Sequence, residues 1–207
     1  MGLQSGMIEF EVDSTQLQRI ELKLKDMKSK APQALKNAVN ATARDAKKDL
    51  AAKAKETYTV KAPKFKQAIK QKNATAAKPT AILKITGKPQ EASNFKTKAN
   101  TESAAAKIQV LKSSSLKEII STRTGNKAFV VSFTKGGKNH DVQNKKAHNS
   151  IMQRRGKARL PIKTFYSPSD PIMVENEAKV YGVVRPTIEQ NLKKNIQKQI
   201  DKILGGK

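Results

Sequence analysis

The sequence predicts an α+β fold in which long N-terminal and C-terminal helices pack on a mainly antiparallel β-sheet. Apolar residues recur every three or four positions near residues 14–30, 32–56 and 187–204, which is the spacing of one helix face. Between residues 79 and 160, short apolar runs bounded by turn residues are typical of strands. Because helical patterns flank a strand-rich middle, we expect one domain over residues 1–207.

The N-terminal part is predicted to contain a short strand followed by two helices. Met7–Val12 alternates apolar and acidic side chains, which indicates a strand within an N-terminal extension over residues 1–12. Asp13 and Ser14 can cap the first helix. Pro32 fits the first turn of the second helix. The apolar face of that helix carries Leu35, Val39, Ala46, Leu50 and Ala54.

The pattern changes after Glu56. Lys61–Lys70 is predicted to be a short helix, because Phe65 and Ile69 are four residues apart. The expected strands of the sheet lie near residues 80–86, 105–112, 127–134 and 150–155. The segments near 87–103 and 135–149 have no apolar period and are rich in Lys and Asn, so we expect exposed loops that project from the core.

A turn followed by a helix is predicted at the C-terminus. The run Ser167–Pro171 contains two prolines and marks a hard turn. Apolar residues then recur at helical spacing from Val180 to Ile203. Pro186 interrupts this pattern and should break or kink the helix, or begin a second one. Gly205 should end it.

The composition points to anionic partners. The chain has 207 residues and a formal net charge of +25, and only 4% of its residues are aromatic. Such a field favours nucleic acid, anionic membranes or acidic protein surfaces, and it opposes self-association at low salt. Most of the basic residues are lysine, which favours nonspecific electrostatic contacts over base reading. Since only 37% of the residues are hydrophobic, we expect neighbouring subunits to complete part of the apolar surface.

Several classes of protein are excluded or disfavoured by the sequence. The absence of cysteine excludes disulfides and thiolate metal sites. No run approaches the roughly 18 apolar residues of a membrane span. Met1–Val12 lacks the basic and apolar regions of a signal peptide. We therefore expect a soluble protein that is made in the cytoplasm.

No catalytic pattern is present, and we expect neither an enzyme nor a cofactor. His140 and His148 lie in a segment rich in Gly, Asn and Lys, where neighbouring lysines repel cations, so a metal site is not expected there. Lys135–Lys138 contains two glycines but is followed by a polar segment instead of a helix, so a tight turn is favoured over a phosphate loop.

The candidate partner-binding residues are the densest arginine cluster of the chain, Arg154, Arg155, Lys157 and Arg159. The cluster can contact DNA in a channel or the acidic face of a neighbouring ring protein. The alternative is a solvated hairpin tip, because no aromatic platform for base stacking is interleaved with it.

A series of short motifs occurs in order along most of the chain. It comprises the Ala-rich helix Pro32–Lys55, Thr59-Val60-Lys61, the basic segment Lys64–Lys70, the strand Thr80–Ile85, Met152-Gln153-Arg154, Leu160-Pro161-Ile162, Pro171-Ile172-Met173 and the final helix. This order, together with the length and the basic composition, resembles the minor tail protein Z family of tailed bacteriophages and prophages. Residues 1–12 and 87–103 do not map onto the family pattern, and Lys replaces much of its Arg.

The resemblance implies a virion structural protein at the head–tail junction. Such a protein would be a tail-completion or tail-terminator (neck) component, assembled in a ring that is expected to be hexameric. Its partners would be further copies of itself, tail-tube and connector proteins, and DNA in the channel. It would reside in the virion after assembly in the host cytoplasm, without catalysis or a cofactor.

Two other readings stay open from the residues alone. One is a nonspecific basic nucleic-acid-binding protein, and the other is a basic protein of membrane surfaces. The sequence lacks helix-turn-helix, zinc and aromatic RNA-binding motifs. It also lacks a basic helix with Trp or Phe on its apolar face. Both observations favour the structural protein, for which we expect no membrane partner.

Overall fold

The structure is a computed structural model that describes residues 2–11, 14–24, 29–98, 105–133 and 148–205. The chain divides into two compact units, which are described separately. Unit 1 comprises Lys55–Pro63 and Lys88–Ser169, and unit 2 comprises Gly2–Ala54, Lys64–Gly87 and Asp170–Lys207. The structure is of mixed α+β class, as predicted. That residues 1–207 fold as one domain stays a prediction.

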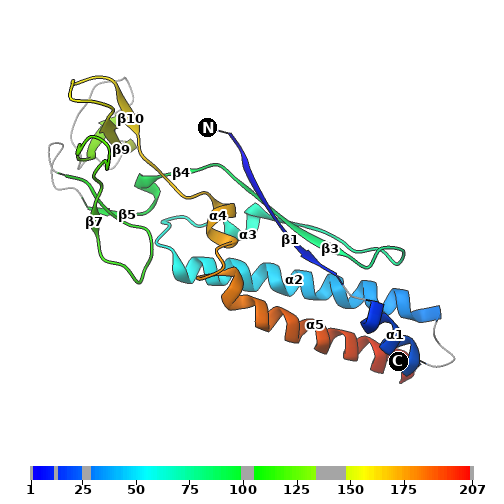
Figure 1. Cartoon of the computed structure of the whole chain (residues 1–207). Helices are drawn as coiled ribbons and strands as arrows, with labels where there is room; N and C mark the ends of the chain where they lie inside the picture. The colour runs from blue at the N-terminus through cyan, green and yellow to red at the C-terminus, as the bar shows by residue number, and fades with distance from the viewer. Residues whose placement is uncertain (1, 12–13, 25–28, 99–104, 134–147, 206–207) are drawn as a thin grey trace. The chain divides into compact units, whose positions relative to one another are not determined.

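Unit 2 contains a three-stranded antiparallel sheet in the order β1-β3-β2 (Figure 1). Its strands are β1 (Gln4–Phe10), β2 (Ile69–Lys72) and β3 (Ala81–Gly87). The side chains alternate between the two faces, as the two-residue period of a strand requires. Ile8, Leu83 and Ile85 are buried on one face, whereas Met7 and Lys84 are opposite each other and exposed on the other face.

The helices of unit 2 are α1 (Ser14–Leu24), α2 (Ala31–Thr57, whose last turn belongs to unit 1), α3 (Phe65–Ala68), α4 (Asp170–Val174) and α5 (Tyr181–Leu204). Within the unit, α2 lies alongside the sheet and α5 lies alongside α2 (Figure 1). All five residues predicted for the apolar face of α2 are buried. Seven of its ten buried positions, from Ala31 to Ala54, are occupied by alanine or threonine, so neighbouring backbones can approach closely.

Polar side chains tie α2 to its neighbours in unit 2. The Asn40 side chain donates to the Ala74 carbonyl (3.1 Å) and accepts from the Ala74 N–H (2.7 Å), which holds the segment after β2. On the other side, the Asn195 amide of α5 donates to the Thr42 hydroxyl (3.0 Å). Lys23 of α1 also contacts α5, because its Nζ donates to Gln197 Oε1 (3.0 Å).

The predicted helix over residues 61–70 is wrong at both ends, because residues 61–64 are not helical and residues 69 and 70 belong to a strand. Only Phe65–Ala68 is helical, and Ile69–Lys72 forms β2. Phe65 and Ile69 are both buried, as apolar residues of a core should be. Their four-residue spacing, however, does not come from one helix, because Ile69 lies in a strand. A β-branched residue favours a strand, and Ile69 pairs directly with Ile85 of β3.

Pro186 does not break the C-terminal helix. Helix α5 begins at Tyr181, earlier than predicted, and continues through Pro186 to Leu204. Because Pro186 lies in the second turn, the backbone bond that it cannot donate would have ended on Gly182. Gly205 caps the helix and donates its N–H to the Asp201 carbonyl (2.7 Å).

Unit 1 is built from short strands in three small antiparallel sheets. The first pairs β4 (Gln90–Glu91) with β11 (Tyr166–Ser167), and the second has the order β5-β6-β7 (Lys96–Lys98, Lys107–Gln109, Lys117–Glu118). The third has the order β10-β9-β8 (Ile162–Thr164, His148–Arg154, Phe129–Phe133). A 3-10 turn, η2 (Ala92–Asn94), follows β4.

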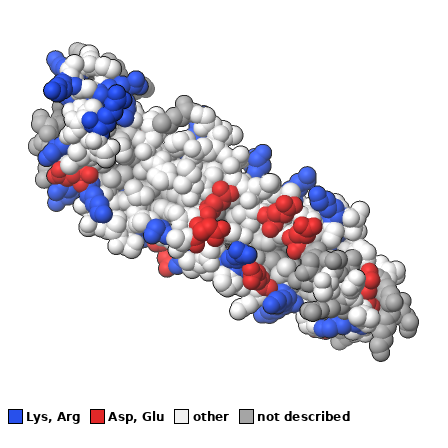
Figure 2. Space-filling view, viewed as in Figure 1, with Lys and Arg blue, Asp and Glu red and all other residues white. Residues whose placement is uncertain are grey.

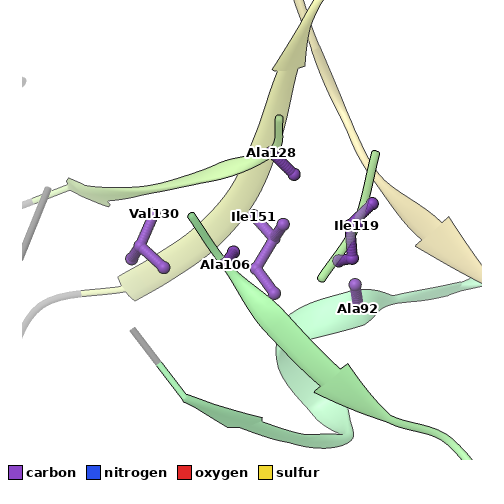
Figure 3. Packing of buried hydrophobic residues seen from close by; sticks show 6 residues of the cluster. All are labelled: Ala92, Ala106, Ile119, Ala128, Val130 and Ile151. Atoms are coloured by element: carbon purple, nitrogen blue, oxygen red, sulfur yellow. The ribbon is translucent and has the colours of Figure 1, made fainter. Parts of the chain in front are cut away.

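The core of unit 1 is small and rich in alanine. Figure 3 shows its buried side chains converging around Ile151 of β9, namely Ala92, Ala106, Ile119, Ala128 and Val130. Backbone bonds connect three of these segments: Ala106 donates to the Ala128 carbonyl (2.8 Å), Ala128 to Ile119 (2.8 Å), and Ile119 to Ala106 (3.1 Å). Alanine methyl groups let these backbones approach closely enough to bond around one isoleucine.

The prediction of one sheet is wrong. Strands were expected near residues 80–86, 105–112, 127–134 and 150–155, and each region contains one, but β3 lies in unit 2 while β6, β8 and β9 belong to two sheets of unit 1. The pattern of a strand shows which face is buried, but it does not identify the strand with which it pairs. The packing of the N-terminal and C-terminal helices on one common sheet is therefore not found.

The expected exposed loop over residues 87–103 is wrong between residues 90 and 98. This part contains β4, η2 and β5, and it buries Ala92 and Phe95 completely. Two isolated apolar residues gave no period, yet they anchor the segment in unit 1. Residues 99–104 and most of the other expected loop, residues 134–147, lie outside the described residues, and His148 and Asn149 belong to β9.

Candidate partner-binding site

The predicted basic cluster lies at the tip of the hairpin formed by β9 and β10. Arg154 is opposite Ile162 in the antiparallel register, and the Arg155 N–H donates to the Pro161 carbonyl (3.1 Å). Residues 156–160 therefore form the turn, and all four predicted residues lie in it or at its base. The Leu160–Pro161 peptide bond is cis.

Arg154 is partly buried and holds the tip together. Its guanidinium lies 5.5 Å from the centroid of the Phe129 ring on β8, at the distance of a cation–π contact. Its Nη1 donates to the Arg159 carbonyl across the turn (2.7 Å). Arg154 thus makes contacts within its own unit, which leaves fewer of its N–H donors for a partner.

The tip is also held from outside the hairpin by Asn126. The Asn126 amide donates to the carbonyls of Gly156 (2.8 Å) and Arg154 (3.3 Å). In return, Gln153, which is buried, donates from Nε2 to the Asn126 carbonyl (2.8 Å). Sequence reasoning missed Asn126. The signal in the sequence was the neighbouring Gly125, because glycine is common in turns. In the structure its φ of 68° marks a turn that brings Asn126 to the hairpin.

Three cations and one apolar side chain are presented at this tip. Arg155, Lys157 and Arg159 are exposed, and none of them forms an ion pair with a carboxylate in the described part of the chain. Leu160, beside them, is 67% exposed. Figure 2 shows Lys and Arg side chains gathered over the part of unit 1 that carries β9 and β10.

One acidic residue of the unit, Glu118 of β7, already pairs with lysines outside the tip. Glu118 pairs with Lys127 (3.4 Å) and lies 3.9 Å from Lys107. An arginine without a carboxylate partner in its own chain is able to make forked contacts to phosphate or carboxylate oxygens of another molecule.

Chemistry of other kinds finds no support in the described residues. His140 lies outside them, the side chain of His148 is not described, and no three acidic or histidine side chains gather as metal ligands in the described ranges. Within the same ranges, no helix has the length and apolarity to cross a bilayer.

Comparison with known protein families gives a match over most of the chain. The family model described as prophage minor tail protein Z (GPZ) matches residues 17–205, nearly the whole chain. No curated protein and no solved structure shows significant similarity to it.

Proposed function

Because the chain belongs to the prophage minor tail protein Z family, we propose that it acts at the head–tail junction of a tailed phage. Family membership makes it a structural protein of the phage tail and associates it with the virion. Our proposal adds its position and form: a tail-completion or tail-terminator (neck) component that assembles as a hexameric ring against tail-tube and connector proteins.

The charge of the chain supports this position. Each copy carries a formal charge of +25, and a closed ring brings these charges together. Six copies would carry about six times the charge of one, and only nearby anions relieve such repulsion. A junction through which DNA passes, and where other proteins meet the ring, supplies anions of both kinds.

The β9–β10 tip is the proposed contact. Arg155, Lys157 and Arg159 lack carboxylate partners in the described part of the chain, and the tip that carries them is fixed by Asn126. A fixed turn loses little conformational entropy on binding, so its charges are available to DNA phosphates or to an acidic face of a neighbouring ring.

The test removes the exposed charges of the tip. In the variant R155Q/K157Q/R159Q, we expect head–tail joining and the titre of infectious particles to fall at least about tenfold, since several charge-assisted contacts are lost together. The matched control is K193Q/K194Q/K198Q, which removes three exposed lysines of α5. Adding Arg154→Gln tests the full cluster, with circular dichroism to check folding because Arg154 packs on Phe129.

Unchanged joining by a folded tip variant would show that the tip is solvated surface. Equal defects in tip and control variants would show that only bulk charge matters.

The +25 charge also favours a second candidate, a nonspecific nucleic-acid-binding protein. This candidate predicts tight binding of duplex DNA by the purified protein, with an affinity that falls steeply as salt rises. It further predicts that particles lacking the protein contain complete tails. Electron microscopy of such particles distinguishes the two candidates. The head–tail role, which we propose, predicts heads and tails that fail to join.

A further inference from the structure

A groove in unit 1, separate from the hairpin tip, is lined by lysines from three parts of the chain. It has a volume of about 430 Å³. Lys55 comes from the last turn of α2, Lys61 from the segment after it, Lys96 from β5, and Lys112 from the turn after β6. All four are exposed, and the groove lies within a single compact unit.

Backbone bonds hold the groove in shape. The segment after α2 is fixed on one side, because Thr59 donates to the Val110 carbonyl (3.0 Å) and Lys112 donates to the Thr57 carbonyl (2.9 Å). On the other side, the Lys61 N–H donates to the Asn94 carbonyl (2.8 Å). The groove is therefore already formed before a ligand binds.

Side chains at the groove strengthen the same arrangement. Gln109 donates from Nε2 to the carbonyls of Lys112 (3.2 Å) and Ser114 (2.5 Å). The Lys61 ammonium donates to the Ser93 carbonyl (2.7 Å). Burial raises the pKa of Tyr58 further above its usual 10, and its neutral phenol adds no negative charge to the groove.

The position of all four lysines is not explained by the dipole of helix α2. Lys55 complements the negative end of the α2 dipole, which explains that residue alone. Lys96 and Lys112 belong to other elements, and in the described part of the chain neither pairs with a carboxylate. None of the described residues that line the groove is acidic. Like charges brought together around a concave surface repel, and a bound anion relieves the repulsion.

The shape and lining of the groove select among anions. A volume of about 430 Å³ is that of a site for a small molecule or a few side chains, and a DNA duplex is too wide to enter it. A single strand would need exposed aromatic rings for stacking, but Tyr58, the one aromatic residue among the described lining residues, is only 5% exposed. Lysine also lacks the forked geometry that arginine offers to phosphate.

We propose that this groove binds an acidic segment of another protein, with the four lysines contacting its carboxylates and Val60 and Pro63 contacting its aliphatic carbons. We assign the segment to a different protein, because the net charge of +25 on a second copy of this chain opposes its approach to the groove, whereas an acidic segment is attracted to it. The proposal stands on the groove alone and holds or fails independently of the head–tail role of the hairpin tip.

The experiment uses the purified full chain and an oligo-glutamate peptide, with binding followed by calorimetry at physiological salt. We expect K55Q/K96Q/K112Q to bind the peptide about tenfold more weakly than the unsubstituted protein, since three partly desolvated ion pairs are lost. Lys61 is retained because it bonds to Ser93. The matched control K88Q/K117Q/K163Q removes three exposed lysines of the same unit that do not line the groove, and it should keep its affinity within about twofold.

A second measurement locates the peptide. Acetylation of lysines, quantified by mass spectrometry, should slow at Lys55, Lys61, Lys96 and Lys112 when the peptide is present, and not at Lys88 or Lys117. Equal losses of affinity in both triple variants, or protection spread over all lysines, would overturn the proposal. So would an oligothymidylate whose binding depends on the groove lysines while peptide binding does not, since the site would then serve nucleic acid.

Discussion

At the scale of single residues, one hydroxyl stands out in the buried face of α2. Thr42 is 0% exposed, donates to the Ala38 carbonyl (2.9 Å) and accepts from Asn195 Nδ2 of α5 (3.0 Å). The contact therefore registers two helices within unit 2 at one point. Neither periodicity nor composition could reveal it, because threonine at a helix position has many possible roles.

We predict that Thr42→Val lowers the free energy of unfolding by about 1–2 kcal/mol, because the near-isosteric side chain leaves the Asn195 amide without its acceptor. Urea unfolding measures the change. The control is Asn195→Ala alone and combined with Thr42→Val. If the two losses simply add, the hydrogen bond does not connect these residues energetically.

Glu175 carries a titration effect. Burial raises its pKa above the usual 4.5, although a hydrogen bond from the Met7 backbone opposes this shift. Gly6 leaves room for the carboxylate, since a Cβ at that position would collide with it. A carboxyl group with a raised folded-state pKa favours folding most below its unfolded pKa, near 4.5. That contribution is lost as the pH rises through the raised folded value.

Glu175→Gln should therefore make the protein more stable at neutral pH, while its amide oxygen can still accept from Met7. It should also flatten the change in stability as the pH rises from 4.5. Urea midpoints of both proteins across this range provide the measurement. A variant that is less stable at pH 7 would show that the charged form of Glu175 is favoured by the fold.

At the scale of elements, the hairpin tip depends on a residue outside the hairpin. We predict that Asn126→Ala speeds amide hydrogen exchange at Arg155 and the neighbouring turn, because the bonds to the Gly156 and Arg154 carbonyls are lost. The core around Ile151 should keep its protection. Unchanged exchange at Arg155 would mean that the strand pairing of β9 with β10 is sufficient to hold the tip.

The sequence predicted correctly those elements whose apolar spacing repeats over many residues. It failed where one contact with a residue distant in sequence determines the secondary structure. The apolar face of α2 was identified because five regularly spaced residues agree on it. Ile69 was assigned to a helix because its spacing from Phe65 fits one, whereas pairing with Ile85 makes it a strand residue. Ala92, Ala106 and Ala128 were not expected in a core, since alanine is common on surfaces and its burial follows from close backbone contact.

The same reasoning grouped Arg154, Arg155, Lys157 and Arg159 correctly at one turn, because they are adjacent in sequence. It could not find the lysine groove, whose members are up to 57 positions apart, from Lys55 to Lys112. Nor could it show that the Arg154 guanidinium packs on the Phe129 ring, since that contact joins two strands.

At the scale of the whole molecule, charge governs association. With +25 on each chain, we predict that the purified protein is monomeric or weakly associated at low salt. Added polyanions or acidic partner proteins should promote assembly. Analytical ultracentrifugation at several salt concentrations provides the measurement. A stable ring formed by the purified protein alone at low salt would contradict the role of repulsion.

The chain passes between its two units at residues 54–55, 63–64, 87–88 and 169–170. Residues 55–63 are consequently separated in the gene from the rest of unit 1, although Thr59 bonds to Val110 within it. Neither unit is thus a contiguous genetic cassette. A recombination event that exchanged only codons 88–169 between phages would combine one parent's strands with the other parent's connecting segment. Viable mosaics should therefore inherit both stretches from the same parent.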